Sequence, residues 1–255
     1  MAIHFRDEGL GEPIVLIHGL GASHRVFDGV ITEGGERHRF VAIDLPRSGR
    51  SKNWADNTPD AIADALEPFL VNRGLTHFRL FGHSFGGLVA LSYAAKYPHR
   101  ISSLTVASAP ALGLPPEARV FLESPLAPMS AMWMTAAPLW RPMVKNYLRW
   151  LWGQPQAFKD DTVDHYLESL QADGFLGGMI DSLRSVGRFR LPKDALTATA
   201  FPRRVLWGEK DPLVPVVQGE QLAIALGADF RVLRDVGHCV PEEHPQGVLA
   251  SIRDH

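Results

Sequence analysis

The sequence predicts an α/β domain, in which a mostly parallel central sheet is flanked by helices on both faces. Three observations support this fold class. Short segments that are mostly apolar alternate with helical segments along the chain. The length of 255 residues fits one large domain or a core with an insertion. Continuously apolar strands are typical of a parallel sheet that is covered on both sides.

Six short segments have the composition of buried strands. They are rich in Val, Ile, Leu and Phe, and turn or helical residues follow each of them. In chain order the expected strands are residues 14–17, 40–43, 78–81, 101–107, 204–207 and 230–233.

Helical patterns fill the spaces between these strands. Residues 58–73 begin with Thr58 as an N-cap and Pro59 in the first turn, and their apolar side chains fall on one helical face. Pro68 interrupts this pattern, so we expect a kink or an end there. Further helices are predicted at residues 85–96, 162–171 and 217–226.

The strand series stops between about Leu112 and Ala200. This stretch holds four of the six tryptophans and five of the six methionines, and residues 162–171 within it have amphipathic helical spacing. We therefore predict a core formed by residues 1–111 and 201–255, with residues 112–200 as a helical cap inserted in it.

Composition narrows the class of protein. The net charge of −2 argues against a nucleic-acid surface, which needs a basic excess. The single cysteine, Cys239, allows no internal disulfide and is compatible with a reducing compartment. The N-terminus has acidic residues where a signal peptide has its apolar region, and the uncharged stretch 124–140 is too short and too rich in proline to span a bilayer. We expect a cytoplasmic protein without a transmembrane segment.

The segment LFGHSFGG, residues 80–87, places Ser84 between Gly82 and Gly86 where a strand turns into a helix. Such a sharp turn lifts the serine hydroxyl clear of the sheet, and side chains two places before and after it would collide, which favours glycine at both positions. The N–H of Phe85 then points to where a developing oxyanion would lie. A glycine-rich structural turn with an incidental serine is the alternative.

Two downstream motifs favour the catalytic interpretation. LWGEKDPLVP places Asp211 just after a strand, and DVGHCVPEEHP places His238 after the next one. A serine becomes a nucleophile when a histidine accepts its proton, and that histidine needs a carboxylate to fix its tautomer. All three residues follow strands, at the edge of a parallel sheet where chemistry usually collects.

These motifs resemble those of the α/β-hydrolase fold, in its serine-nucleophile, esterase-like branch. VLIHGLGAS, residues 15–23, is similar to the oxyanion loop of that family, and AIDLPRSGRS, residues 42–51, is similar to its next strand and loop. The family more usually has Gly-His where this chain has Arg47-Ser48, so the local turn is not predicted. The resemblance covers nearly the whole chain except the insertion, which corresponds to the family's cap.

The resemblance implies a serine hydrolase that cleaves a carboxylic ester or a related acyl compound. It assigns Ser84 as nucleophile, His238 as base and Asp211 as the acid, with the amides of Leu20 and Phe85 as oxyanion hole. The alternatives are cleavage of C–C bonds, lactones or amides by the same triad, or a small-molecule receptor with little turnover. Dehalogenases and epoxide hydrolases are disfavoured, since those relatives have aspartate at the position of Ser84.

Other polar residues have simpler explanations. Glu209 and Asp235 are rivals to Asp211, His18 is expected to hold the oxyanion loop, and His83 to pack beneath the turn. Cys239 is more simply a small buried residue than a nucleophile. The chain lacks HExxH, and GLGASH lacks the third glycine of a dinucleotide fingerprint, so neither a metal nor a cofactor is expected.

The apolar residues of the insertion suggest a pocket for an apolar acyl or aryl group. Most of them are explained by packing of the cap, but we expect some to face the serine. The predicted pocket residues are Met129, Trp133, Met134 and Trp140.

Overall fold

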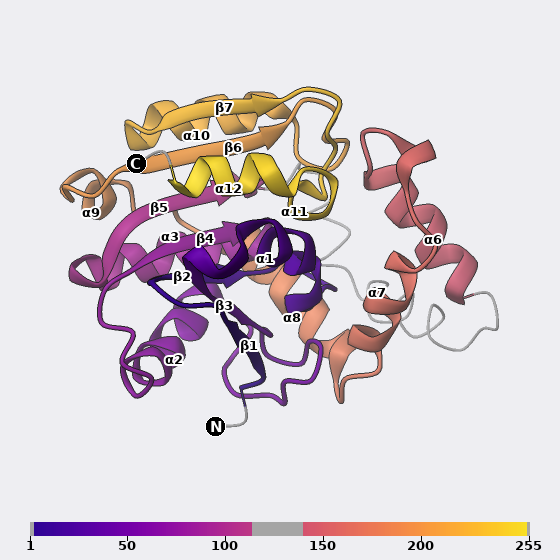
Figure 1. Cartoon of the computed structure of the whole chain (residues 1–255), viewed down its shortest axis with the longest axis horizontal. Coiled ribbons are helices and arrows are strands. Elements are labelled where there is room, and N and C mark those ends of the chain that lie inside the picture. Colours follow the sequence, from indigo (N-terminus) through magenta and orange to yellow (C-terminus); the bar gives the residue numbers. More distant parts are fainter. Residues whose placement is uncertain (1–2, 114–139, 254–255) are drawn as a thin grey trace.

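The computed structural model describes residues 3–113 and 140–253, and these contain one seven-stranded sheet with the order β1-β3-β2-β4-β5-β6-β7 (Figure 1). Only β1 runs antiparallel to its neighbour, so the predicted fold class is confirmed. The strands are β1 (Phe5–Glu8), β2 (Glu12–Ile17), β3 (His38–Ile43), β4 (Phe78–His83), β5 (Ile101–Ala107), β6 (Arg203–Gly208) and β7 (Asp229–Leu233).

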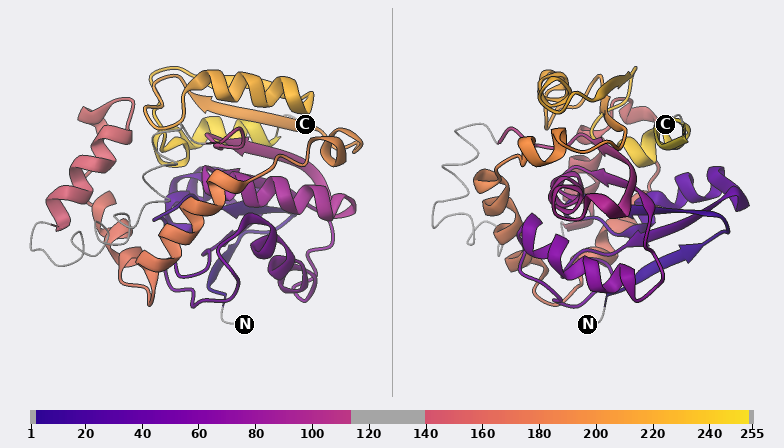
Figure 2. Two further views of the ribbon diagram at one scale, coloured as in Figure 1. Left: turned by 180° about the vertical axis from the view of Figure 1, so that it is seen from behind. Right: turned by 90° about the vertical axis from the view of Figure 1, so that its left-hand side faces the viewer.

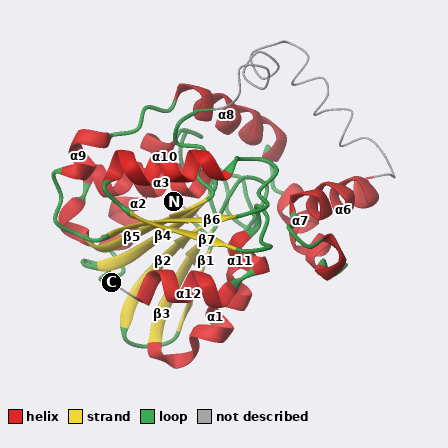
Figure 3. Ribbon diagram, turned by 90° about the horizontal axis from the view of Figure 1, so that it is seen from above, coloured by secondary structure: helices red, strands yellow, loops and turns green. Residues whose placement is uncertain are grey.

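Helices flank this sheet on both faces (Figure 3). One face carries α2, α3 and α10. The other face carries α1 and α12, and these two helices are in contact. The α-helices are α1 (Asp28–Gly34), α2 (Pro59–Val71), α3 (Phe85–Lys96), α6 (Trp140–Leu151), α7 (Thr162–Leu170), α8 (Phe175–Arg188), α9 (Lys193–Thr197), α10 (Val216–Leu226), α11 (Val240–Glu243) and α12 (Pro245–Arg253). Short 3-10 turns occur at His24–Phe27, Gly35–Arg37, Pro98–Arg100 and Pro155–Ala157.

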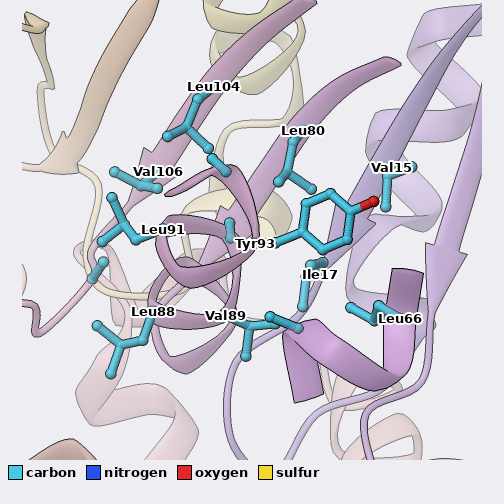
Figure 4. Close-up of a cluster of buried hydrophobic side chains, with 14 of the residues drawn as sticks. Val15, Ile17, Leu66, Leu80, Leu88, Val89, Leu91, Tyr93, Leu104 and Val106 are labelled. Carbon is cyan, nitrogen blue, oxygen red and sulfur yellow. The ribbon is translucent and has the colours of Figure 1, made fainter. Parts of the chain in front are cut away.

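Two apolar clusters, one on each face of the sheet, form the core. The central helix α3 is buried on all sides from Phe85 to Ala94, which is why its sequence is apolar around its whole circumference. Figure 4 shows the side chains of Leu88, Val89 and Leu91 leaving α3 in different directions, all within one cluster of buried apolar residues. Burying one such side chain contributes roughly 1.5–3 kcal/mol, so this helix is held firmly beneath the centre of the sheet.

The structure differs from the sequence expectations at two elements of the core. Pro68 does not end its helix, because α2 continues to Val71 and the proline falls in its last turn. The strand β1 was not predicted, because its sequence, FRDE, has a single apolar residue. The antiparallel pairing of β1 with β3 makes it an edge strand, and an edge strand needs less apolar surface than a central one.

The chain between β5 and β6 forms α6, α7, α8 and α9 in its described part. In Figure 1, α6 and α7 stand beyond the arrowheads of the central strands, and in Figure 2, α8 runs beside α3, which it contacts. We refer to α6, α7 and α8 together as the helical segment. The division into a core and a cap with the expected boundaries stays a prediction.

No helix within residues 3–113 and 140–253 is both long enough and apolar enough to cross a bilayer.

Candidate active site

Ser84 lies between the carboxyl end of β4 and the first turn of α3. Its backbone φ is +53°, a left-handed conformation that non-glycine residues rarely adopt. Such strain costs of the order of 1–3 kcal/mol and persists only where the surroundings enforce it. Here the enforcing elements are a buried strand and a buried helix, joined without a loop between them.

The two glycines around Ser84 are required by close backbone contacts. A Cβ on Gly82 would lie 2.4 Å from the carbonyl oxygen of Gly86, and a Cβ on Gly86 would lie 2.3 Å from the carbonyl oxygen of Ile17. Both distances are shorter than any normal contact, so a side chain at either position would push the helix away from the sheet. This is the close approach that the motif predicts.

Three of the predicted residues are joined in a hydrogen-bonded chain. Nε2 of His238 lies 3.1 Å from Oγ of Ser84, and Nδ1 of His238 lies 2.8 Å from Oδ2 of Asp211. Asp211 follows β6 and His238 follows β7, so three parallel strands bring together residues that are far apart in the sequence.

The surroundings of Asp211 fix the direction of these hydrogen bonds. Burial would raise the pKa of Asp211, but the imidazole of His238 and the N–H of Val214 outweigh it and lower the pKa below its ordinary value. Oδ1 accepts the N–H groups of Leu213 and Val214, both at 2.9 Å. The ionised carboxylate therefore accepts Nδ1–H of His238, and Nε2 of the neutral ring is left to accept the proton of Ser84.

The two rival carboxylates bind elsewhere. Glu209 accepts the backbone N–H of Asp235 at 3.1 Å, and the carboxylate of Asp235 pairs with Lys210 at 2.6 Å. Among the described residues, Asp211 is the carboxylate bonded to the ring of His238.

His18 connects the loops that follow β2 and β3, as expected. Its Nε2 accepts the N–H of Leu45 at 3.0 Å, so Nδ1 carries the proton and donates to the carbonyl oxygen of Gly19 at 2.7 Å. Burial lowers the pKa of His18, which keeps this tautomer neutral. The ring therefore fixes the loop that contains Gly19 and Leu20.

His83 supports His238 from the other side. Its Nε2–H donates to the carbonyl oxygen of His238 at 2.7 Å, and the two rings lie 5.1 Å apart. Burial, followed by the nearby His238, lowers the pKa of His83 to about 3. This neutral ring, which also lines the cavity over Ser84, adds no charge beside His238.

The predicted oxyanion residues, Leu20 and Phe85, belong to segments that adjoin Ser84. Phe85 is the first residue of α3, a position whose N–H has no partner within the helix. A Cβ on Gly19 would lie 3.0 Å from Cβ of Ser84, so the loop of Gly19 and Leu20 runs directly beside the serine. Leu20 and Phe85 both line the cavity that opens at Ser84.

A mostly apolar cavity of about 460 Å³ lies over Ser84 and His238. The helical segment supplies much of its lining, and its residues recur at helical spacing along one face of each helix. From α6 these are Met143, Val144, Tyr147, Leu148 and Leu151; from α7, Tyr166 and Leu170; and from α8, Phe175, Met179, Leu183 and Val186.

Sequence reasoning located the pocket in the right part of the chain but named other residues. Met129, Trp133 and Met134 lie outside the described residues, as does the side chain of Trp140, the first residue of α6. The lining residues of α6 and α8 were missed. Their recurrence every three or four positions was the available signal, but such spacing does not reveal which face of a helix meets a neighbour.

Tyr166, which lines this cavity, is hydrogen-bonded to a buried carboxyl group. The hydroxyl of Tyr166 donates to Glu242 at 2.7 Å, and burial raises the pKa of Glu242 to about 8. Cys239 lines the cavity beside them and is 2% exposed. Burial raises the pKa of its thiol well above the usual range, so Cys239 is a small buried residue, as expected, rather than a thiolate.

A second cluster has donors that suit a metal ion. His4 and His24 each place Nδ1 at 2.9 Å from a different oxygen of Asp44. The oxygens of Asp44 also accept the N–H groups of His24, at 2.7 Å, and Arg50, at 3.0 Å. Both oxygens of Asp44 thus already accept hydrogen bonds. The cluster is explained as a structural brace between loops.

The loop that departs from the expected motif contains a left-handed residue. Arg47 has a φ of +55°, and its side chain packs on α8, where a Cβ on Gly178 would lie 2.9 Å from its Cδ. Arginine thus occupies a backbone conformation that favours glycine, and it contacts the helical segment.

Comparison with known proteins agrees with this fold. The model of the alpha/beta hydrolase family matches residues 14–251. An uncharacterised protein of Mycobacterium bovis is 28% identical over 251 residues, covering 92% of this chain and 72% of that protein. A 2-hydroxy-6-oxononadienedioate/2-hydroxy-6-oxononatrienedioate hydrolase of Burkholderia vietnamiensis is 26% identical over 265 residues, covering 96% and 88%. The structure of a thermophilic esterase from Thermogutta terrifontis superposes with a TM-score of 0.82 at 24% identity, covering 99% of this chain and 92% of that one.

Proposed function

Because this chain belongs to the alpha/beta hydrolase family, we propose that it is a serine hydrolase that cleaves a carboxylic ester or a related acyl compound through an acyl-enzyme intermediate. The observation that carries the proposal is the hydrogen-bonded chain from Ser84 through His238 to Asp211, which opens into an apolar cavity.

The first step is attack of Ser84 on the acyl carbonyl. Nε2 of His238 accepts the hydroxyl proton as the Oγ–C bond forms, and Asp211 stabilises the imidazolium that results. The tautomer deduced from the bonds of Asp211 leaves Nε2 ready for this role, and the 3.1 Å separation from Oγ is within hydrogen-bonding range.

The tetrahedral intermediate places a negative charge on the former carbonyl oxygen. The N–H groups of Phe85 and Leu20 are the donors we propose for it, since they flank Ser84 and line the cavity. His238 then returns its proton to the leaving alcohol, whose C–O bond breaks. A water molecule, activated by the same histidine, attacks the acyl group and releases the acid together with free Ser84.

The substrate that suits this cavity has an apolar acyl group. The cavity wall consists largely of aliphatic and aromatic side chains from three helices, and one of its polar members, Tyr166, is hydrogen-bonded to Glu242. We propose that residues 112–200 act as a cap that selects the acyl group. The expected contribution of Met129, Trp133, Met134 and Trp140 stays a prediction.

Cleavage of a C–C bond is the second candidate. The similarity to the hydrolase from Burkholderia vietnamiensis extends over 96% of this chain and favours it. The same three residues would serve either reaction, so the comparison of substrates decides between them.

A panel of p-nitrophenyl esters of increasing acyl length, with a vinylogous 1,5-diketone as the C–C substrate, tests the proposal. We expect ester turnover that a fluorophosphonate abolishes by labelling Ser84, and no labelling of Ser84→Ala. Labelling at another residue, or turnover of neither substrate class, would contradict the proposed function.

A further inference from the structure

The loop of His238 and the end of α6 are joined backbone to backbone. The N–H of His238 donates to the carbonyl oxygen of Leu151 at 2.7 Å, and Leu151 is the last residue of α6. The candidate base is therefore bonded to the helix that lines the cavity.

Glu243 forms a second connection between the same two parts. Its Oε2 accepts the N–H of Gly153 at 2.8 Å, and both of its oxygens lie 3.0 Å from the N–H of Gly237. Its Oε1 also accepts the N–H of Cys239 at 3.1 Å. One carboxylate thus holds the residues on both sides of His238 and the residue that follows α6 by two positions. Hydrogen bonds to an ionised acceptor are the stronger kind.

Two glycines permit this close approach. A Cβ on Gly153 would lie 2.2 Å from the carbonyl oxygen of Asp235, and a Cβ on Gly237 would lie 2.1 Å from that of Leu151. In both cases the obstacle is backbone, which cannot rotate away as a side chain can. The contact between α6 and the histidine loop, here called the α6–histidine junction, therefore depends on glycine on both sides.

The helix held by this junction also contacts the acyl region of the cavity. Leu148 and Leu151 line the cavity and are nearly fully buried, whereas Tyr147 and Met143 line it and remain partly exposed. A substrate that fills the cavity must contact α6, and α6 is hydrogen-bonded to the loop of His238 through the α6–histidine junction.

We propose that Glu243 is a positioning residue, which makes the placement of His238 depend on the seating of α6. An acyl group that packs against α6 would then improve the geometry of the base as well as the binding of the substrate. This inference deepens the proposed function and rests on it. Glu243 is not an alternative acid of the triad, because its oxygens bind backbone N–H groups while Asp211 binds the ring.

The first test is a pair of conservative variants. Glu243→Gln keeps the shape but presents an amide donor to backbone donors, and Glu243→Asp keeps the charge but shortens the reach. Because a misplacement of about 1 Å can cost about 10²-fold in rate, we expect kcat to fall 10- to 100-fold in both variants. In the wild type kcat should rise with acyl length, and in the variants kcat should stay flat while KM still falls. A loss by one common factor at every acyl length would show a structural role only.

The second test reaches the α6–histidine junction from its other side. Gly153→Ala should reproduce the kcat defect, and the double variant with Glu243→Gln should be no worse than the poorer single variant, because both break one connection. Gly177→Ala on α8 is the matched control, since its new Cβ would meet no atom closer than 3.7 Å. Multiplicative effects in the double variant would overturn the proposal.

Hydrogen–deuterium exchange gives a readout that does not need turnover. In Glu243→Gln, peptides covering residues 236–240 and 148–154 should both exchange faster than in the wild type. Acceleration of the first peptide alone would mean that Glu243 braces the histidine loop without α6. If wild-type enzyme exchanges as expected but hydrolyses no ester, the proposed function fails while the α6–histidine junction stands; if it hydrolyses esters and the variants behave as wild type, only this inference fails.

Discussion

The two sides of the cavity are constructed in different ways. On the sheet side, Ser84, Asp211 and His238 stand on turns after parallel strands, held by hydrogen bonds and by close backbone packing that leaves no room for a Cβ at Gly82 or Gly86. On the helical side, the lining consists of apolar side chains from α6, α7 and α8, without a short polar bond to the serine among the described residues. The sheet side holds the reacting side chains in fixed positions, whereas the helical side forms an apolar wall around the space for the substrate.

This difference implies a division of tasks. A reacting atom must be placed within a fraction of an ångström, which rigid backbone achieves. An apolar wall needs only the right size, and substitutions in it change affinity in steps of about 0.8 kcal/mol for each methylene. Changes on the sheet side should therefore affect the rate for every substrate, while changes on the helical side should reorder substrates.

The largest effect is expected from removing the nucleophile. Ser84→Ala should lower kcat by at least about 10³-fold and by as much as ~10⁶-fold, because no other hydroxyl stands at the turn. Steady-state kinetics on the preferred ester measures it. Ser92→Ala is the matched control, since this serine is also buried on α3 and its hydroxyl has no hydrogen-bond partner in the structure. Equal activity of both variants would refute the role of Ser84.

Asp211→Asn should have the next largest effect. The amide would leave the ring of His238 free to adopt the wrong tautomer, which costs ~10⁴-fold in kcat in enzymes of this type. The exposed Asp235, which pairs with Lys210, provides the control Asp235→Asn, expected to keep wild-type activity. If the Asp235 variant is the inactive one, the assignment of the acid is wrong.

The effect of pH on the rate should be smaller than the effects of these two substitutions and larger than those of substitutions on the helical side. The base must be neutral to accept the proton of Ser84, so kcat/KM should fall as the pH is lowered from 8 to 5. The pKa of Asp211 is lowered, so this carboxylate stays ionised across the whole range. A flat profile for folded enzyme would count against His238.

On the helical side we expect a change of ranking. Leu148→Ala enlarges the cavity next to the acyl group and should shift the preference between short and long esters by about tenfold, through three lost carbon atoms. Ratios of kcat/KM over the ester panel measure it. Ile224→Ala on α10, whose side chain is 76% exposed, is the control. A uniform decrease in rate without reordering would break the proposed division of tasks.

The smallest expected effect concerns the brace around Asp44. Burial would raise its pKa, but the bonds from His24 and Arg50 and the nearby His18 lower it from 3.8 to about 2. A carboxylate with a depressed folded pKa stabilises the protein above pH 3.8, and this stability is lost as pH falls towards 2. Between pH 5 and 3 the loss should be about 1 kcal/mol in urea unfolding, and Asp44→Asn should lack it. An identical pH slope in both proteins would contradict this account.

The same contrast explains how far the sequence could be interpreted. The core strands β4 and β5 are mostly apolar, and the predicted ranges 78–81 and 101–107 agree closely with the observed ones. Gly82, Ser84 and Gly86 form a pattern whose cause is purely local. The edge strand β1 was missed because FRDE has no apolar pattern to detect. The lining of α8 was missed because its spacing indicates a helix but not the surface that meets the cavity, which is determined by packing between elements distant in sequence. The role of Glu243 was not predicted, because nothing in the sequence signals that its partners are backbone N–H groups.

The two edges of the sheet also determine how this molecule behaves beside copies of itself. The edge strand β1 carries Arg6, Asp7 and Glu8, and the edge strand β7 carries Asp229 and Arg231. An incoming strand that tried to extend the sheet would have to accommodate these fixed charges, whose partners include Arg39 for Asp7 and Arg204 for Asp229. The charged side chains of the edge strand β1 therefore protect the protein against aggregation by strand addition. Replacing them with neutral residues should make a concentrated solution of this protein turbid sooner.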